Sequence, residues 1–380
     1  MKPELENYTD VSTQEMTINM GPQHPATHGV LRLVIKVDGE ILTWADPDVG
    51  NLHRCAEKIA ENLTYPQYIP YTDRLDYLAS MNNNLGYCLS VEKLLALEIP
   101  ERAQFIRTIV VELNRIASHL VAFGAYSLDI GAWTPLLYAF REREWILKLL
   151  EEISGARMTY SYMRIGGVSA DIDANWIENC RNYLNEQEKR WEEYNRLLSF
   201  NKIFIKRTAN ITPVTPEDAI AYGLTGPCLR GSGVDFDLRR DFPYLVYDKL
   251  DFKVCLGCGE KGTLGDCWDR YWVRMLEIKE SIKIVRQCLD MLPEGEILSK
   301  EVKKVIKPPA GEAYVRTENP KGEVGYYVVS DGSKQPYRVR VRAPSFNNLS
   351  PTARILPGWM LADAVAWIGS LDIVLGEVDR

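Results

Sequence analysis

The sequence of 380 residues has no apolar run long enough to form a membrane-spanning helix. Such a helix needs about 20 predominantly apolar residues. The longest candidate, residues 116–140, is interrupted by Asp129 and also contains His119 and Pro135. The acidic start, "MKPELENYTD", lacks the apolar segment of a secretory signal peptide. We therefore expect buried helices in residues 116–140 and no export signal.

Positively charged residues are also fewer than negatively charged ones. Lys and Arg number 45 against 52 Asp and Glu, so the formal net charge is −7. Affinity for a phosphate backbone depends on clustered Lys and Arg, and this balance argues against a nucleic-acid-binding protein. The composition, with 46% hydrophobic and 26% charged residues, excludes a disordered chain. A chain of this length is expected to divide into roughly two or three subdomains.

A second Cys-x-x-Cys pair is absent, because the eight cysteines are scattered and a single pair occurs in "VCLGCGEKGTLGDC". In a chain without an export signal, reduced thiols are the default. We expect five of them to be small buried residues: Cys55, Cys88, Cys180, Cys228 and Cys288.

The loop that carries Cys255, Cys258 and Cys267 needs a separate interpretation. A zinc site needs a fourth ligand, and no histidine follows His119, which leaves Cys228 as the nearest other thiol. We favour inert thiols in this loop, with a metal or a disulfide as the alternatives.

Hydrophobic periodicity predicts an α+β fold in three segments. Residues 1–51 are predicted to be rich in strands, because "LRLVIKVDGEILTW" alternates around the turn Asp38-Gly39. Residues 52–306 are predicted to form a central helical bundle, and residues 307–380 return to alternating strands followed by an apolar helix. The predicted helices cover residues 52–63, 73–97, 100–120, 134–154, 174–198, 267–291 and 358–370, with a short one after Thr215.

Two histidines, His24 and His28, lie in the short stretch "GPQHPATHG". A His-x-x-x-His pair binds zinc when both rings share one face of a helix. Pro25 and Gly29 make a helix unfavourable here, so we predict no metal. On these residues alone, a structural turn is the simplest interpretation and a hydrogen-bonding loop is the alternative.

Two further stretches contain polar groups in apolar surroundings. Residues 52–77 contain several tyrosines, whose apolar ring and polar tip suit a binding site, although a charged surface helix is the simpler interpretation. "AYSLDIGAWTP" places Asp129 among apolar residues, where a carboxylate needs a partner or a raised pKa. An arginine would be the simplest partner.

Taken together, six stretches resemble the D-subunit family of respiratory complex I, which is a relative of the [NiFe]-hydrogenase large subunit. The stretches are "GPQHPATHGVLRL", "NLHRCAEKIAENLTYPQYIPYTDRLDY", "SLDIGAWTPLLYAFREREW", "GARMTYSYMRIGGV", "GLTGPCLRGSGVDFDLRR" and "GSLDIVLGEVDR". They occur in the order of the family and cover the chain from about residue 17. The resemblance implies a hydrogenase-large-subunit-like fold and a subunit of a membrane-bound NADH–quinone oxidoreductase.

The resemblance also implies the site residues. His28 matches the histidine that faces the quinone, Tyr77 the tyrosine opposite it, and Asp129 the acid behind the histidine. Quinone reduction takes two electrons and two protons, and a phenol and an imidazole can each donate a hydrogen bond and then a proton. An aspartate bound to the imidazole fixes its tautomer and favours its protonated form.

His24, Arg54 and Arg74 match positions around the quinone cavity and near the terminal iron–sulfur cluster. That cluster belongs to a partner subunit of the B type, so this chain is expected to hold no cofactor or metal of its own, with quinone as the substrate. Further expected partners are a C-type peripheral subunit and an H-type membrane subunit at the entrance of the quinone tunnel. The implied location is the cytoplasmic side of the inner membrane, as a peripheral subunit, and the implied role includes proton translocation.

The sequence departs from the family pattern at two positions near this site. Cys55 stands where the family usually has glycine, and its Cβ predicts a negative φ. Thr159 stands where the family often has histidine, which predicts a cluster potential that responds less to pH.

Three other functions are the alternatives. A sister complex fed by reduced ferredoxin or a deazaflavin would use a similar chain. A [NiFe] hydrogenase needs two Cys-x-x-Cys pairs, whereas Cys288 is the last cysteine here and Cys55 and Cys88 are too far apart to form a pair. A scaffolding subunit with an inactive site is disfavoured by the presence of His28, Tyr77 and Asp129.

Overall fold

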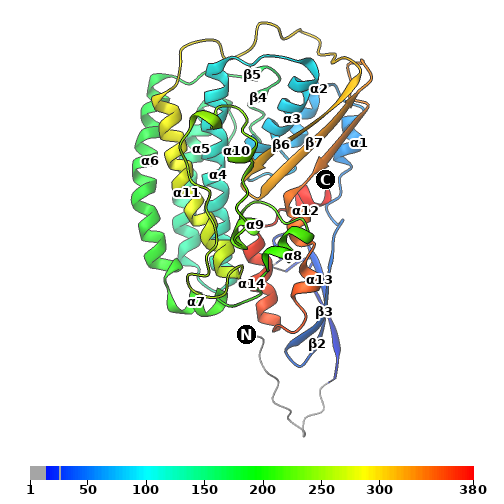
Figure 1. Ribbon diagram of the computed structural model, residues 1–380, viewed down its shortest axis with the longest axis vertical. Helices are drawn as coiled ribbons and strands as arrows, with labels where there is room; N and C mark the ends of the chain where they lie inside the picture. The colour runs from blue at the N-terminus through cyan, green and yellow to red at the C-terminus, as the bar shows by residue number, and fades with distance from the viewer. Residues whose placement is uncertain (1–13, 25–26) are drawn as a thin grey trace.

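The computed structural model describes residues 14–24 and 27–380. Four long helices lie side by side and form one half of the molecule, and two three-stranded antiparallel sheets occupy the other half (Figure 1). The long helices are α4 (Glu101–Asp129), α5 (Thr134–Ser154), α6 (Ala174–Tyr194) and α11 (Cys267–Asp290). The predicted α+β class is therefore confirmed in its general form.

Helix α4 is the centre of the bundle, because α5, α11, α3 and α14 all pack against it. Its buried residues occupy nearly every face, which is typical of a helix surrounded by others. The predicted start at Thr134-Pro135 and stop at Gly155 of the next helix are confirmed, and Gly155 has the left-handed φ of 76° that ends helices. Between α4 and α5 the chain turns at Ile130 and Gly131, so residues 116–140 form the mostly buried end of α4 and the start of α5. Leu137 and Phe140 are exposed there, so the expectation of buried helices is wrong for the start of α5.

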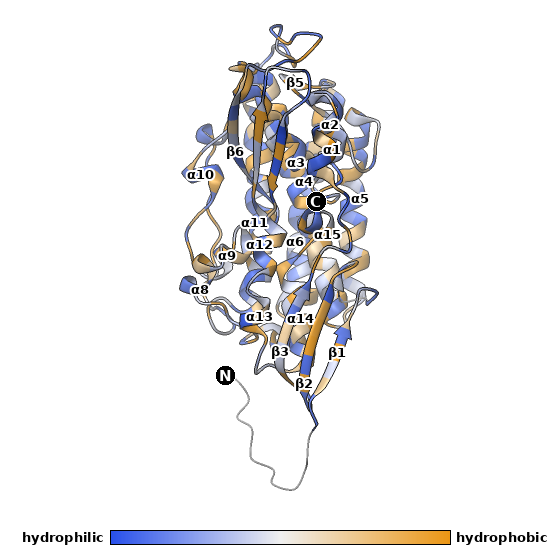
Figure 2. Cartoon of the chain, turned by 90° about the vertical axis from the view of Figure 1, so that its right-hand side faces the viewer, coloured by the Kyte–Doolittle hydropathy of each residue, from blue (hydrophilic) through white to orange (hydrophobic). Residues whose placement is uncertain are grey.

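The N-terminal sheet has the order β1-β2-β3, from β1 (Met16–Met20), β2 (Arg32–Asp38) and β3 (Ile41–Asp48). Buried Leu33, Ile35 and Val37 alternate with more exposed residues along β2, so one face of the sheet is apolar (Figure 2). This face packs in a second hydrophobic core with Trp367 and Ile368 of α14 (Leu361–Leu371). The predicted turn at Asp38-Gly39 is confirmed, with φ 62° at the glycine.

The second sheet has the order β6-β7-β8, from β6 (Gly311–Asn319), β7 (Gly322–Ser330) and β8 (Arg338–Arg342). Helix α3 (Ser80–Leu95) packs on β6 and β7, and their tight turn at residues 320–321 points into the molecule, because Lys321 is fully buried. The remaining elements are α1 (Ala56–Ala60), α2 (Tyr65–Thr72), β4 (Met163–Arg164), β5 (Gly167–Val168), α7 (Lys202–Thr208), α8 (Pro216–Ala221), α9 (Pro227–Gly231), α10 (Leu238–Asp241), α12 (Pro344–Leu349), α13 (Thr352–Ile355) and α15 (Leu375–Asp379).

Four of the helices differ from their predicted bounds. The helix predicted for residues 73–97 begins only at Ser80, because the Asp76 carboxylate accepts the backbone N–H groups of Leu78 and Ala79 and holds a turn there. The helix predicted from residue 358 begins at Leu361, because the Gly358 N–H donates to Leu42 of β3 instead. The helix predicted for residues 52–63 shrinks to α1, and the long helix predicted for residues 174–198 finishes as a π-helical turn over Asn195–Ser199.

No helix among residues 14–24 and 27–380 has both the length and the hydrophobicity to cross a bilayer.

Candidate functional site

The loop between β1 and β2 presents His28 in a strained and well-anchored turn. His28 has φ 50°, in the left-handed region that few residues with a side chain adopt. Fully buried Thr27 holds the turn, because its backbone N–H and its hydroxyl both donate to the His24 carbonyl at 3.0 and 2.7 Å. His24 and Gly29 also form an isolated β-bridge. Pro25, which the sequence placed inside this turn, lies outside the described residues.

The His28 ring contacts the last residue of α4. Its Nε2 lies 2.7 Å from Oδ2 of Asp129, and the two side chains are only 14% and 7% exposed. The partner of Asp129 is therefore a histidine rather than an arginine. Burial lowers the pKa of His28, but the hydrogen bond and the charge of Asp129 outweigh it, so the pKa of the imidazole is raised above 6.5. The contact with Asp129 therefore favours the protonated form of His28.

Helix α14 closes the other side of the pair. A Cβ at Gly369 would lie 2.6 Å from the Tyr126 ring and 2.8 Å from Asp129 Oδ2, closer than real contacts allow. The glycine therefore allows the backbone of α14 to lie against the carboxylate. The C-terminal segment thus helps to fix the orientation of Asp129.

Tyr77 lies in the turn between α2 and α3 and is partly buried. Burial raises the pKa of its hydroxyl, the Asp76 carboxylate adds to this effect, and Lys321 and Arg54 oppose it. In the described part of the chain no hydrogen bond joins Tyr77 to His28 or to Asp129. The charge of Lys321 lowers the pKa of both Tyr77 and His28.

The other tyrosines of the 52–77 stretch do not form a site with Tyr77. Tyr65 and Tyr68 are fully buried core residues, and Tyr68 packs edge-on against Tyr87 with ring centroids 5.1 Å apart. Tyr71 is exposed and lies parallel to Tyr68 at 6.0 Å. Only Tyr77 has the buried charged neighbours described above.

Arg54 and Arg74 lie together at the exposed edge of this region. Arg54 donates to the Arg74 carbonyl at 2.6 Å, and Arg74 donates to the Pro70 carbonyl at 2.6 Å. The C-terminal segment anchors the edge, because the Asp379 carboxylate accepts the backbone N–H groups of residues 50 and 52 at 2.8 and 2.6 Å. Two cationic side chains are therefore presented on a fixed rim.

Two predictions about Cys55 are wrong. Its φ is 57°, not negative, and its side chain is exposed, not buried. The backbone N–H groups on both sides of it, those of Arg54 and Ala56, donate to the same Arg380 carbonyl at 3.4 and 3.3 Å, and this sharp bend imposes the left-handed conformation. Thr159 also has a positive φ, of 54°.

The four other cysteines predicted to be buried, Cys88, Cys180, Cys228 and Cys288, are buried, and all eight thiols are free. Cys267 is buried at the start of α11, with its sulfur 3.1 Å from the Thr212 hydroxyl, whereas Cys258 is exposed. The described residues contain no group of three or more His, Cys, Asp or Glu side chains that could hold a metal ion.

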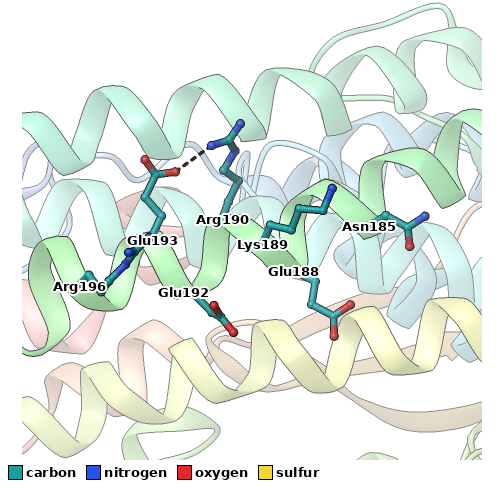
Figure 3. Close-up of a pocket in the computed structure, with 7 residues that line it drawn as sticks. All are labelled: Asn185, Glu188, Lys189, Arg190, Glu192, Glu193 and Arg196. Carbon is teal, nitrogen blue, oxygen red and sulfur yellow. Dashed lines mark hydrogen bonds and ion pairs between the residues drawn. The ribbon is translucent and has the colours of Figure 1, made fainter.

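A groove of about 860 Å³ on α6 is lined by Asn185, Glu188, Lys189, Arg190, Glu192, Glu193 and Arg196 (Figure 3). Charged and amide side chains line it throughout, and Arg190 pairs with Glu193 at 3.1 Å. A quinone ring would find no apolar wall there. The groove contains none of the residues that the sequence singled out.

Sequence reasoning missed a group of buried charges that includes the neighbour of Tyr77. Lys321 is buried between two buried carboxylates, those of Asp76 at 3.3 Å and Asp372 at 3.7 Å. Asp76 and Asp372 occur in the quoted family stretches, but nothing in their spacing indicates that they meet.

Comparison with known proteins identifies relatives of this chain. The family model described as "Respiratory-chain NADH dehydrogenase, 49 Kd subunit" matches residues 129–308 and 299–380. The D subunit of the NADH-quinone oxidoreductase of Carboxydothermus hydrogenoformans is 52% identical over 369 residues, which cover 97% of this chain and 100% of that protein. The D subunits of the same enzyme from Chlorobaculum tepidum and Desulforamulus reducens are each 53% identical, and the matches cover 98% and 97% of this chain and 94% and 99% of theirs.

Proposed function

We propose that this chain forms the site where the quinone headgroup is reduced. The proposal proceeds from its family: the chain belongs to the family of the 49 kDa subunit of respiratory NADH–quinone oxidoreductase, also called its D subunit. Within this proposal Tyr77 and His28 are the proton donors, and Asp129 positions and charges His28. The arrangement of a helical bundle beside two three-stranded sheets is proposed to be that of the [NiFe]-hydrogenase large subunit.

The contact between His28 and Asp129 carries the proposal. A histidine with a raised pKa, held by a carboxylate at 2.7 Å on a stiff loop, can keep a transferable proton near neutral pH. The strained φ of His28 supports a functional role, because such conformations concentrate at sites where the surroundings hold a side chain in place.

The reaction assigned to the site balances as one quinone, two electrons and two protons giving one quinol. The Tyr77 O–H and the protonated His28 ring each donate a hydrogen bond to a quinone carbonyl and then a proton, which leaves a tyrosinate and a neutral imidazole. Solvent protons then restore both groups. The separation of the two donors on different elements, the α2–α3 turn and the β1–β2 loop, suits a substrate with two opposite carbonyls.

The electrons are proposed to come from an iron–sulfur cluster in a B-type partner subunit, with Arg54 and Arg74 on the rim that faces it and His24 at the edge of the quinone cavity. A C-type peripheral subunit and an H-type membrane subunit complete the proposed surroundings, with the chain as a peripheral subunit on the cytoplasmic side of the membrane. After proton donation Tyr77 carries a negative charge and His28 has lost its positive charge, and such changes of charge have strong effects in a cavity of low dielectric. Its relief is the proposed link to proton translocation.

Tyr77→Phe tests the proposal, because it removes the hydroxyl and keeps the ring. A hydrogen bond to a group that becomes charged contributes about 1.5–3 kcal/mol, so turnover should fall roughly 10- to 100-fold. The measurement is NADH-driven quinone reduction in membranes, divided by the reduction of an artificial acceptor that takes electrons upstream. The exposed Tyr337→Phe is the matched control. Wild-type turnover and quinone affinity in an assembled Tyr77→Phe complex would contradict the proposal.

A further inference from the structure

A single lysine lies buried behind the two proposed proton donors. Lys321, in the turn between β6 and β7, has no exposed surface. Its Nζ lies 3.3 Å from Asp76 Oδ2 and 3.7 Å from Asp372 Oδ2, and it donates to the Ser118 hydroxyl at 3.0 Å. A buried ammonium group is costly unless it is paired, and these three contacts stabilise the positive charge of Lys321.

On one side, Lys321 supports the turn that carries Tyr77. Asp76 uses Oδ1 to accept the backbone N–H groups of Leu78 and Ala79 at 3.0 and 3.2 Å. Its other oxygen, Oδ2, has no hydrogen-bond partner and faces Lys321. The residue that pairs with the lysine is thus the immediate neighbour of Tyr77, and it fixes the backbone on which Tyr77 sits.

On the other side, Lys321 reaches the segment that supports Asp129. Asp372 follows directly after α14, in the left-handed conformation with φ 55°, and its carboxylate lies between Lys321 and Arg274, at 3.7 Å from each. The same helix presents Gly369 to the Asp129 carboxylate. The ammonium therefore lies between the elements that hold the two donors.

The charges around Lys321 are close to balance. Lys321 and Arg274 carry two positive charges, and Asp76 and Asp372 carry two negative charges. The remaining acid, Glu377, is fully buried, and burial and the charge of Asp76 raise its pKa, which favours its neutral form. Removing the ammonium would leave this region with an excess negative charge.

We infer that Lys321 is a positioning residue for quinone reduction, whose fixed positive charge makes both Tyr77 and His28 release their protons more readily. The inference rests on the proposed function of the site. As each donor gives its proton to a quinone oxygen, the donor becomes more negative by one charge. A nearby ammonium stabilises that product, and it needs no rearrangement during the reaction.

The pKa shifts of the donors agree with this geometry. Burial is the largest influence on Tyr77 and Asp76 adds to it, and both raise the pKa, whereas Lys321 and Arg54 lower it. For His28, burial lowers the pKa, Asp129 and Asp372 raise it, and Lys321 lowers it. Lys321 is the group that acts on both donors in the direction of proton release.

The inference predicts different effects for two variants of this lysine. Lys321→Met removes the charge, so the kcat of quinone reduction should fall about tenfold at neutral pH, and the alkaline limb of its pH profile should move up by about one unit as His28 holds its proton more tightly. Lys321→Arg keeps the charge, so its alkaline limb should stay in place. The exposed Lys189→Met is the matched control for assembly and activity.

The double variant Lys321→Met with Asp76→Asn removes one charge of each sign, and an asparagine can still accept the two backbone N–H groups. It tests the inference if the single variant does not assemble, because it keeps Asp129 and Asp372, the carboxylates that raise the pKa of His28, so the alkaline limb should still move up. An assembled Lys321→Met or double variant with a wild-type limb would overturn the inference. A limb that moves as far in Lys321→Arg as in Lys321→Met would overturn it as well.

Tyr77→Phe, measured in the same membranes, separates this inference from the proposed function. If Tyr77→Phe loses turnover and the lysine variants keep the wild-type profile, only the role of Lys321 fails. If Tyr77→Phe retains wild-type turnover, the assignment of the quinone site itself fails.

Discussion

Replacing Asp129 with asparagine should change the pH dependence of the rate of quinone reduction. The alkaline limb of that profile, where the rate falls as pH rises, should move to lower pH. The change preserves the shape of the side chain at the end of α4 and removes the charge 2.7 Å from His28. Asp129 raises the pKa of His28 against the effect of burial, so its loss must lower that pKa. In the proposed mechanism His28 must be protonated to act as a donor, so activity is lost as pH rises through its pKa. When that pKa is lowered, the alkaline limb should move to lower pH with it.

The size of the effect follows from the contact. A hydrogen bond to a charged group contributes about 1.5–3 kcal/mol, and one pKa unit corresponds to about 1.36 kcal/mol, so the limb should move by roughly one to two units. Above the new pKa, where His28 is mostly neutral, turnover should fall about 10- to 100-fold, whereas at acidic pH it should approach that of the wild type.

The assay is the pH dependence of NADH-driven quinone reduction in membranes, normalised to upstream electron transfer at each pH. Asp38→Asn, in the exposed turn between β2 and β3, is the matched control. Lys321→Met should move the same limb in the opposite direction. A general loss of stability would not move the limb in opposite directions in the two variants. An assembled Asp129→Asn complex with an unmoved limb would refute the reasoning.

Two further predictions concern the cysteines. Cys55→Gly should leave the thermal inactivation temperature of the assembled complex unchanged or higher, because a φ of 57° suits glycine, whereas the β-branched Cys55→Val should lower stability by about 1–2 kcal/mol; equal behaviour of the two variants would contradict the strain. The purified complex should contain no nickel, and its zinc content should be the same in the wild type and in Cys255→Ser; one equivalent of zinc lost in the variant would reveal a metal at the cysteine loop.

Local patterns predicted the long helices because a buried stripe repeats along each of them. The start of α5 at Thr134 and its stop at Gly155 depend only on neighbouring residues and were found where the sequence indicated, although the N-cap is Trp133 and not Thr134. The start of α3 was missed because the Asp76 side chain competes for backbone N–H groups, which hydrophobic periodicity does not register.

The site depends on contacts that no local rule can supply. His28 and Asp129 are 101 residues apart, and their pairing was suggested by family resemblance, not by spacing. The φ of Cys55 is set by hydrogen bonds to Arg380 at the other end of the chain. Lys321 lies in a turn next to a glycine, where a lysine is normally exposed, so its burial becomes visible only when β6, α3 and the C-terminal segment are brought together.

The central claim is that this chain binds the quinone headgroup between the β1–β2 loop and the α2–α3 turn. The most direct test is photolabelling of the assembled complex with a quinone that carries an azide on its ring, followed by peptide mapping. We predict labels in residues 27–31 or 73–79 that excess unmodified quinone suppresses. Competed labels that fall only on other subunits, or on this chain far from both segments, would contradict the account.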